Sequence, residues 1–171
     1  RVTSHVGLRA VSGSITKAAV LEAIALLHRT LRLAGVASPR LAVAALNPHG
    51  GEGGLFGREE MDAIAPAVEG AKARGVDAAG PFPADTIFLR AKKGLCDAIV
   101  SMYHDQGQIA MKLMGFERGV TVQGGLPLPI TTPAHGTALD IAGQGQANPS
   151  ALWHAFQIAC RMATGAWAQG R

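Results

Sequence analysis

Short apolar runs alternate with helical stretches along this chain, and this alternation constrains its fold most strongly. The runs 41–46 and 97–102 have the length of strands and show no regular alternation of polar residues. Strands of this kind are buried on both faces, as in a parallel sheet that helices cover on both sides. The sequence therefore predicts an α/β fold with a parallel-rich sheet and helices on both faces.

Three stretches of the sequence show helical periodicity between start and stop signals. Their expected bounds are an N-cap at Ser14 to a stop at Gly35, 59–73, and Pro149 to about Ala166. Residues 119–122 are expected to form another strand, and 80–83, with two prolines, a turn. Residues 2–4 resemble the end of a strand, so we expect that an N-terminal part of the fold is missing.

The composition is that of a globular chain, with 171 residues, 48% of them hydrophobic and 16% charged. The net charge of +4 is modest and few aromatic residues accompany the basic ones, so nucleic acid is not the expected partner. Cys96 and Cys160 belong to no Cys-x-x-Cys pair and are interpreted as reduced core residues of a cytoplasmic protein. No apolar run has the length of a membrane helix, so no membrane partner is expected.

Three histidines each follow the C-terminal end of an apolar run: His5, His49 and His104. In an open parallel sheet these ends share one edge, where ligands bind. Taken singly, each is more readily a loop or capping residue, but their common placement favours a metal site. Neutral imidazole suits Zn, Mn, Co or Fe, and Asp105 or the substrate could complete an open coordination sphere. Two further histidines lie in predicted helices without a motif and are assigned to surface or packing: His28 and His154.

Two glycine-rich loops differ in what they predict. The loop 47–54 holds four glycines around His49, which allows a close backbone approach to a ligand, but it matches no nucleotide fingerprint. Residues 135–149 resemble the adenosine-binding loop of the isopropylmalate and isocitrate dehydrogenases. That resemblance implies that Asp140 binds the ribose hydroxyls, which favours NAD over NADP. It implies these cofactor-binding residues: His135, Gly136, Thr137, Ala138, Asp140, Ile141 and Asn148.

Four segments read together resemble the 4-hydroxythreonine-4-phosphate dehydrogenase family over essentially the whole chain. They are 47–49 with the following glycines, 80–86, 103–107 and 135–149. The resemblance implies the C-terminal half of an isopropylmalate-dehydrogenase-like fold whose N-terminal part is missing. Residues 1–133 would form a metal- and substrate-binding dimerisation domain. Residues 134–171 would provide the NAD loop and a C-terminal helix that packs on the missing domain.

The family resemblance also implies roles for single residues. His5, His49 and His104 match three ligands of a divalent metal (Zn, Mn, Co or Mg) that two subunits of a homodimer share. Asp85 matches an acidic residue near the substrate, and Lys112 matches a substrate-binding lysine. The implied reaction is oxidation of a substrate hydroxyl by NAD, followed by decarboxylation, as in pyridoxal phosphate biosynthesis.

The residues alone make this chemistry reasonable. A metal lowers the pKa of a substrate hydroxyl, and Asp85 or Asp105 could then serve in proton transfer. Lys112 could bind a carboxylate or phosphate group as a point charge. Two alternatives stay open: a surface ion pair for Lys112, and support of a histidine or simple capping for Asp105.

Two positions depart from the family pattern and leave the substrate open. Thr121 and Ile130 stand where the vitamin-forming members have an asparagine and an arginine, although Thr121 remains a candidate substrate contact. Losing the arginine weakens the case for a multiply charged substrate end at that place. Family relatives act on four-carbon sugar-acid phosphates or on the cis-dihydrodiol of terephthalate. A non-catalytic ligand-binding homologue and a metal hydrolase are the alternatives of another class, and a hydrolase has no use for the Asp140 loop.

Overall fold

The computed structural model describes residues 1–115 and 118–165. These residues divide into two compact units. The first comprises 1–32 and 36–110, and the second comprises 33–35 and the chain from 111 onward. As a packing boundary this differs from the predicted division at 133/134, which concerned the roles of the two segments and stays a prediction.

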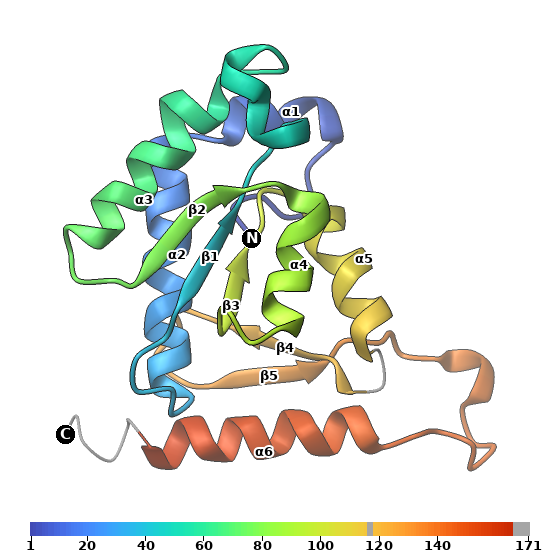
Figure 1. Cartoon of the computed structure of the whole chain (residues 1–171). Coiled ribbons are helices and arrows are strands. Elements are labelled where there is room, and N and C mark those ends of the chain that lie inside the picture. The colour runs from blue at the N-terminus through green and yellow to red at the C-terminus, as the bar shows by residue number, and fades with distance from the viewer. Residues whose placement is uncertain (116–117, 166–171) are drawn as a thin grey trace. The chain divides into compact units, whose positions relative to one another are not determined.

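A three-stranded parallel sheet forms the centre of the first unit, as Figure 1 shows. Its strands are β1 (Leu41–Ala44), β2 (Ala78–Phe82) and β3 (Ala98–Val100), in the order β2-β1-β3. The predicted α/β class with a parallel sheet is therefore confirmed. Both predicted strands of this sheet exist, but each is shorter than its apolar run.

Helices surround this sheet, and two further segments have unusual geometry. The segment η1 has 3-10-type hydrogen bonds, but residues 49–53 within it do not have helical backbone angles, and η2 is a π-helix. Their bounds are α1 Leu8–Ser14, α2 Lys17–Leu33, η1 Pro48–Gly54, η2 Glu60–Ile64, α3 Ala65–Lys72, α4 Ala84–Lys92 and α5 His104–Gly115. In the described part of the chain, no single helix meets the length and hydropathy needed to cross a membrane. Only α1 and α2 taken together, bent by 91°, pass that test as a broken segment.

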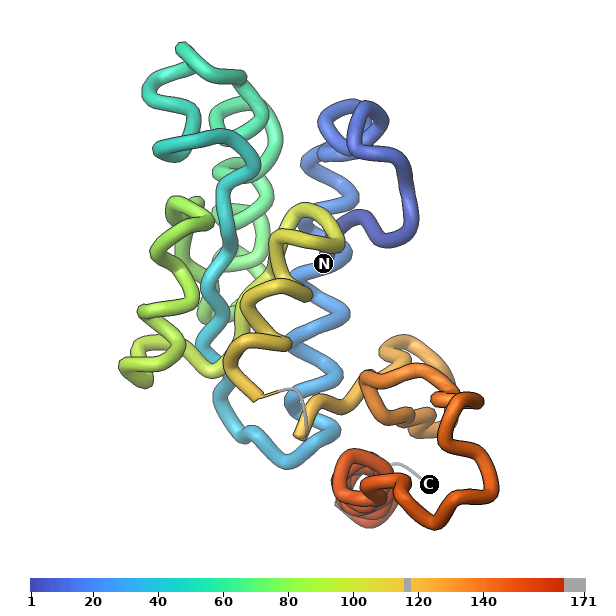
Figure 2. Tube along the Cα trace, turned by 90° about the vertical axis from the view of Figure 1, so that its right-hand side faces the viewer, coloured from blue at the N-terminus to red at the C-terminus, as the bar shows by residue number. Residues whose placement is uncertain are grey.

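The central strand β1 is buried on both faces because its alternate side chains enter two separate hydrophobic clusters. Val43 packs in the cluster that contains Ile24 of α2, and Ala44 packs in the cluster that contains Ile87 of α4. All four side chains of β1 are fully buried. Figure 2 shows β1 between α2 and α4. Burial on both faces explains why the run 41–46 has no polar alternation.

The predicted N-cap at Ser14 is wrong. Ser14 is the last residue of α1, and its hydroxyl donates a hydrogen bond to the carbonyl of Ala10. The hydroxyl of Thr16 instead accepts a hydrogen bond from the amide of Ala19, at 3.2 Å, and α2 begins at Lys17. A separate short helix thus precedes α2, and the side chain that caps α2 lies in the two-residue connection between them.

Two other local predictions also need correction. Residues 80–83 were expected to form a turn, but Gly80 to Phe82 belong to β2, an edge strand, where proline is tolerated because one side of the strand needs no ladder hydrogen bonds. Residues 2–4 are not assigned as a strand. They nevertheless run beside the chain that follows β3, because the amides of Val2 and Thr3 donate to the carbonyls of Ser101 and Met102.

The second unit consists of an antiparallel hairpin, a loop and a helix. These are β4 (Val120–Gln123), β5 (Ile130–Pro133), the short η4 (Leu139–Ile141) and α6 (Ser150–Gly165). The helix packs along the hairpin (Figure 1), and the hydroxyl of Thr131 on β5 donates to the carbonyl of Ala155. The predicted strand at 119–122 and the predicted last helix are confirmed. The helix end predicted at Ala166 lies outside the described residues.

The prediction that both cysteines are core residues holds for Cys96 alone. Cys96 is buried, whereas Cys160 is exposed. Cys160 lies outside the stripe of α6 that packs inward, which contains Ala151, Ala155 and Met162. Apolar neighbours in the sequence therefore did not indicate which side of the helix Cys160 occupies.

Candidate functional site

Two of the three predicted metal ligands lie next to each other in the first unit. His104 is the first residue of α5, which follows β3 after a short connection. His5 lies two residues after Thr3, and the backbone amides of Val2 and Thr3 donate to carbonyls in that connection. The ring centroids of His5 and His104 are 5.2 Å apart. Backbone hydrogen bonds at Val2 and Thr3 thus bring together two imidazoles from opposite ends of the unit.

Asp105 holds the ring of His104. Nδ1 of His104 lies 2.6 Å from Oδ1 of Asp105. When His104 is neutral and carries its proton on Nδ1, this hydrogen bond leaves the lone pair of Nε2 for a ligand. Of the roles considered for Asp105, support of a histidine is the one that its contact fits.

His49 lies in η1 with its ring centroid 6.3 Å from that of Phe56. Within residues 1–115 and 118–165 no group of three or more His, Cys, Asp or Glu side chains is arranged to hold a metal. A catalytic zinc takes three protein ligands, and His5 and His104 would supply two of them. The chemistry of the donors fits a divalent metal, and the assignment of His49 as third ligand stays a prediction.

A buried carboxylate beside the His49 loop was not predicted from the sequence. Glu60, the first residue of η2, is only 3% exposed and accepts hydrogen bonds from the backbone amides of Leu46 and Asn47. Its signal in the sequence is weak, since Glu59 and Glu60 look alike as acidic residues near the start of a helix.

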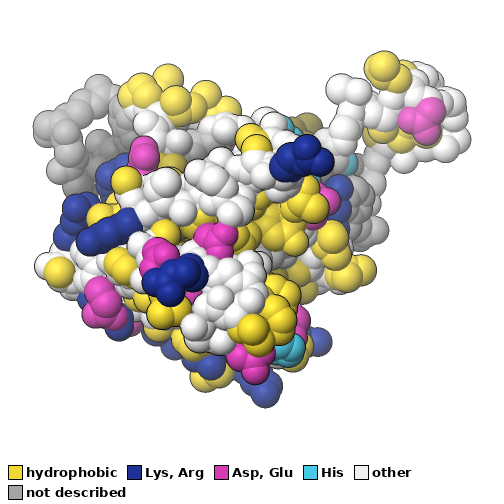
Figure 3. Space-filling view, turned by 90° about the horizontal axis from the view of Figure 1, so that it is seen from above, with side chains coloured by type: hydrophobic (Ala, Val, Ile, Leu, Met, Phe, Trp, Pro, Cys, Tyr) yellow, Lys and Arg dark blue, Asp and Glu magenta, His cyan; other side chains and the backbone are white. Residues whose placement is uncertain are grey.

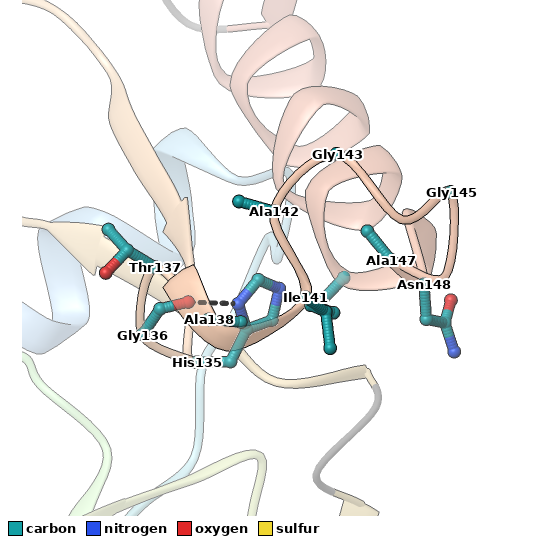
Figure 4. Close-up of a pocket in the computed structure, with 11 residues that line it drawn as sticks. His135, Gly136, Thr137, Ala138, Ile141, Ala142, Gly143, Gly145, Ala147 and Asn148 are labelled. Atoms are coloured by element: carbon teal, nitrogen blue, oxygen red, sulfur yellow. Dashed lines mark hydrogen bonds between the residues drawn. The ribbon is translucent and has the colours of Figure 1, made fainter.

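A pocket of about 610 Å³ lies in the second unit at the predicted NAD loop, as Figure 4 shows. All the residues predicted to bind the cofactor line it except Asp140, which lies in η4. The lining residues are His135, Gly136, Thr137, Ala138, Ile141, Ala142, Gly143, Gly145, Ala147, Asn148 and Ala151. Small and apolar side chains predominate, which suits the flat face of a base.

Local hydrogen bonds shape this loop. Nδ1 of His135 lies 2.9 Å from the carbonyl oxygen of Gly136, a bond drawn in Figure 4. Ala138 adopts a left-handed φ of 47°, and the side-chain amide of Gln144 donates to the carbonyl of Asp140 at 2.8 Å. The carboxylate of Asp140 is exposed, so it can accept hydrogen bonds from a ligand.

The predicted substrate residues lie in both units. Asp85 is exposed in the first turn of α4, in the first unit. Lys112 is exposed on α5, about two helical turns beyond His104. Thr121 is half-buried on β4, opposite Thr132 of β5. Ile130, the other position that departs from the family pattern, is exposed. Their roles in substrate binding or catalysis stay predictions.

Charged side chains of both signs are interspersed on the face drawn in Figure 3. This face therefore has no continuous basic patch of the kind that tracks a nucleic-acid backbone.

Comparison with known proteins identifies the family. The family described as "Pyridoxal phosphate biosynthetic protein PdxA" matches residues 1–159. The chain belongs to the PdxA family. The family resemblance predicted from the sequence is thereby confirmed.

Individual relatives agree with this assignment. A Pseudomonas aeruginosa protein provisionally named 4-hydroxythreonine-4-phosphate dehydrogenase 2 is 62% identical over 164 residues, which cover 95% of this chain and 49% of that protein. A D-threonate 4-phosphate dehydrogenase from Cupriavidus necator is 48% identical, with 95% and 49% covered. The crystal structure of a 4-hydroxythreonine-4-phosphate dehydrogenase from Klebsiella pneumoniae matches with a TM-score of 0.83 and 42% identity, over 94% of this chain and 49% of that one. The chain thus spans about half the length of the PdxA relatives that it matches.

Proposed function

We propose that this chain is the metal- and NAD-binding half of a dehydrogenase of the 4-hydroxythreonine-4-phosphate type, which acts in pyridoxal phosphate biosynthesis. The observation that carries the proposal is the pocket at residues 135–148. All the residues expected to bind the cofactor line this pocket except Asp140. The names of the PdxA relatives support an oxidoreductase. We place it in the cytoplasm, in keeping with the free Cys96 and Cys160.

The residues of the chain divide the chemistry among them. When bound, a divalent metal (Zn, Mn, Co or Mg) would supply the Lewis acid that lowers the pKa of a substrate hydroxyl, and NAD would supply the hydride acceptor. His5 and His104 would hold the metal together with a third histidine, which we assign to the partner subunit's His49 in a homodimer. Asp105 orients the ring of His104, as its 2.6 Å contact allows.

Substrate and cofactor would be bound by residues outside that cluster. Asp85 would accept the hydroxyl proton, and Lys112 would bind the phosphate or carboxylate of a hydroxy acid. Thr121 would contribute a further polar contact with the substrate. The pocket would hold the adenosine, with the ribose hydroxyls donating to Asp140.

The substrate has one serious second candidate. A relative of 48% identity is named a D-threonate 4-phosphate dehydrogenase. The family resemblance also implies that Ile130 stands where the vitamin-forming members have an arginine. We therefore propose D-threonate 4-phosphate as the alternative to 4-hydroxythreonine 4-phosphate. The terephthalate cis-dihydrodiol, which carries no phosphate, is a third compound for the same assay.

The test is NADH absorbance with the full-length protein, a divalent cation and each of these substrates. We expect one of the two phosphorylated acids to be oxidised with the higher kcat/KM. No NADH with any of the three compounds, from protein that is folded and loaded with metal, would refute the dehydrogenase and favour a non-catalytic binding protein.

Substitution of Asp140 by asparagine tests the cofactor site separately. Asp140→Asn removes a charged acceptor of ribose hydrogen bonds, so the KM for NAD should rise about ten- to a hundredfold, the size of a lost charged hydrogen bond. Asp62→Asn is the control. Asp62 lies in η2, outside the pocket loop, and forms an exposed ion pair with Arg58, so this substitution should leave the KM for NAD unchanged. A metal hydrolase that uses the same histidines would be indifferent to both substitutions.

A further inference from the structure

The loop that carries His49 has a run of left-handed backbone. The φ angles from His49 to Gly53 are all positive, between 43° and 80°. His49 and Glu52 are not glycines, and residues with a side chain rarely adopt this backbone conformation. Strained backbone of this kind persists only where the surrounding structure holds it.

Glu60 makes the contacts that hold the start of this loop. Its Oε1 accepts hydrogen bonds from the amides of Leu46 and Asn47, at 2.7 and 2.8 Å. Its Oε2 accepts one from Nδ2 of Asn47, at 2.9 Å. All three partners are donors, and the carboxylate is almost completely buried. An ionised carboxylate is the side chain that can accept all three bonds without presenting a donor of its own.

Gly51 within the loop and Gly57 just after it allow the backbone to approach this carboxylate and the side chain of Asn47. A Cβ on Gly51 would lie 2.6 Å from Oε2 of Glu60, and a Cβ on Gly57 would collide with Nδ2 of Asn47. The side-chain amide of Asn47 also donates to Glu59, which in turn accepts a hydrogen bond from the hydroxyl of Ser12. Both ends of the loop therefore close around one buried acceptor and one amide.

We propose that Glu60 is a positioning residue for His49. The carboxylate fixes the backbone at Leu46 and Asn47, just after β1, and the side chain of Asn47, two residues before His49. The imidazole therefore projects from one conformation of the loop. Its effect on catalysis rests on the proposed function, in which His49 is a metal ligand. Its effect on the loop does not depend on that function.

The decisive variant is Glu60→Gln in the full-length protein. The oxygen of glutamine can still accept from the two backbone amides, but its NH2 group then faces the NH2 group of Asn47, so two donors meet. Glu69→Gln is the matched control, because Glu69 lies on the adjoining α3 with its side chain 69% exposed and paired with Lys72.

Hydrogen exchange of the metal-free protein reads the loop directly. In Glu60→Gln the amides of Leu46 and Asn47 should exchange at least about tenfold faster, while the amide of Val43 in β1 keeps its rate. Equal acceleration at all three amides would show a loss of global stability and overturn the proposal. Glu69→Gln should change none of them.

Cobalt binding and enzyme kinetics test whether Glu60 positions the imidazole of His49. We expect Glu60→Gln to weaken Co²⁺ affinity about 10- to 100-fold, to alter the cobalt absorption spectrum and to lower kcat, with the KM for NAD unchanged. Wild-type spectrum, affinity and kcat in this variant would overturn the positioning role. If Glu60→Gln does not fold, Glu60→Asp, which shortens the reach by one methylene, takes its place with the same expected results. Wild-type protein that neither binds cobalt nor forms NADH would refute the proposed function instead, and the exchange rates would still decide the role of Glu60 in the loop.

Discussion

Gly51 and Gly53 show at the scale of single residues how a surrounding structure decides what a position tolerates. Both have a left-handed φ, of 80° and 67°. An added Cβ on Gly51 would meet Glu60, whereas one on Gly53 would meet no atom within 4 Å. The two glycines look alike in the sequence, and only one of them is required by space.

Alanine substitutions should separate backbone strain from steric conflict. Gly53→Ala should lower the free energy of unfolding by roughly 1–2 kcal/mol, the cost of a left-handed residue with a side chain. Gly51→Ala should lower it further by more than about 1 kcal/mol, because the Cβ also collides with a buried carboxylate. Urea unfolding of both variants measures the difference, and equal losses would contradict the packing seen around Gly51.

At the scale of elements, an ion pair joins the starts of two neighbouring strands. Asp97 precedes β3 and accepts hydrogen bonds from the backbone amide, Nε and a terminal nitrogen of Arg40, which precedes β1. The hydrogen bonds from the Arg40 side chain, then that from its amide, lower the pKa of Asp97 to about 2. The pair is exposed, so solvent screens much of its contribution.

This shift predicts how stability depends on pH. The folded pKa lies below the unfolded one, so the stabilisation is fully present above about pH 4 and is lost as pH falls towards 2. Thermal melting of wild type and Asp97→Asn should differ at neutral pH and converge near pH 2. A difference between their melting temperatures that stays constant over this range would show that Asp97 acts through packing and not through its charge.

At the scale of the whole molecule, we propose that two copies of the chain build the metal site together. His5 and His104 lie together, and no third ligand joins them within the described residues. A closed dimer with a two-fold axis would place the partner subunit's His49 at each site, giving two equivalent sites.

Hybrid dimers test this sharing. In a mixture of His49→Ala and His104→Ala chains, each hybrid keeps one site with all three histidines intact. About half of the dimers are hybrids at equal amounts, so activity should recover to about a quarter of wild type, although each variant alone is inactive. No recovery after subunit exchange, with hybrids shown by native mass spectrometry, would place the three ligands within one chain.

Local patterns of the sequence predicted a large part of this protein. The buried run at 41–46 indicated β1 and its cover of helices, because burial on both faces excludes polar alternation within the strand itself. Residues 135–149 also predicted the lining of the pocket, because nearly all the lining residues come from this one contiguous loop. Periodicity was less reliable at helix starts, where Ser14 and Thr16 are both suitable cap residues by type but only Thr16 caps α2.

The sequence by itself determined the α/β class, the family and the loop that lines the pocket, because each depends on patterns within short contiguous segments. The tertiary structure alone decided that Glu60 is buried against Leu46 and Asn47, 14 and 13 residues away, while its neighbour Glu59 lies nearer the surface. It also decided that His104 lies beside His5, with their ring centroids 5.2 Å apart. Such contacts depend on how segments far apart in the sequence pack against each other. The free energy that favours one packing over another is a property of the whole fold, so the spacing of residues within one segment does not predict it.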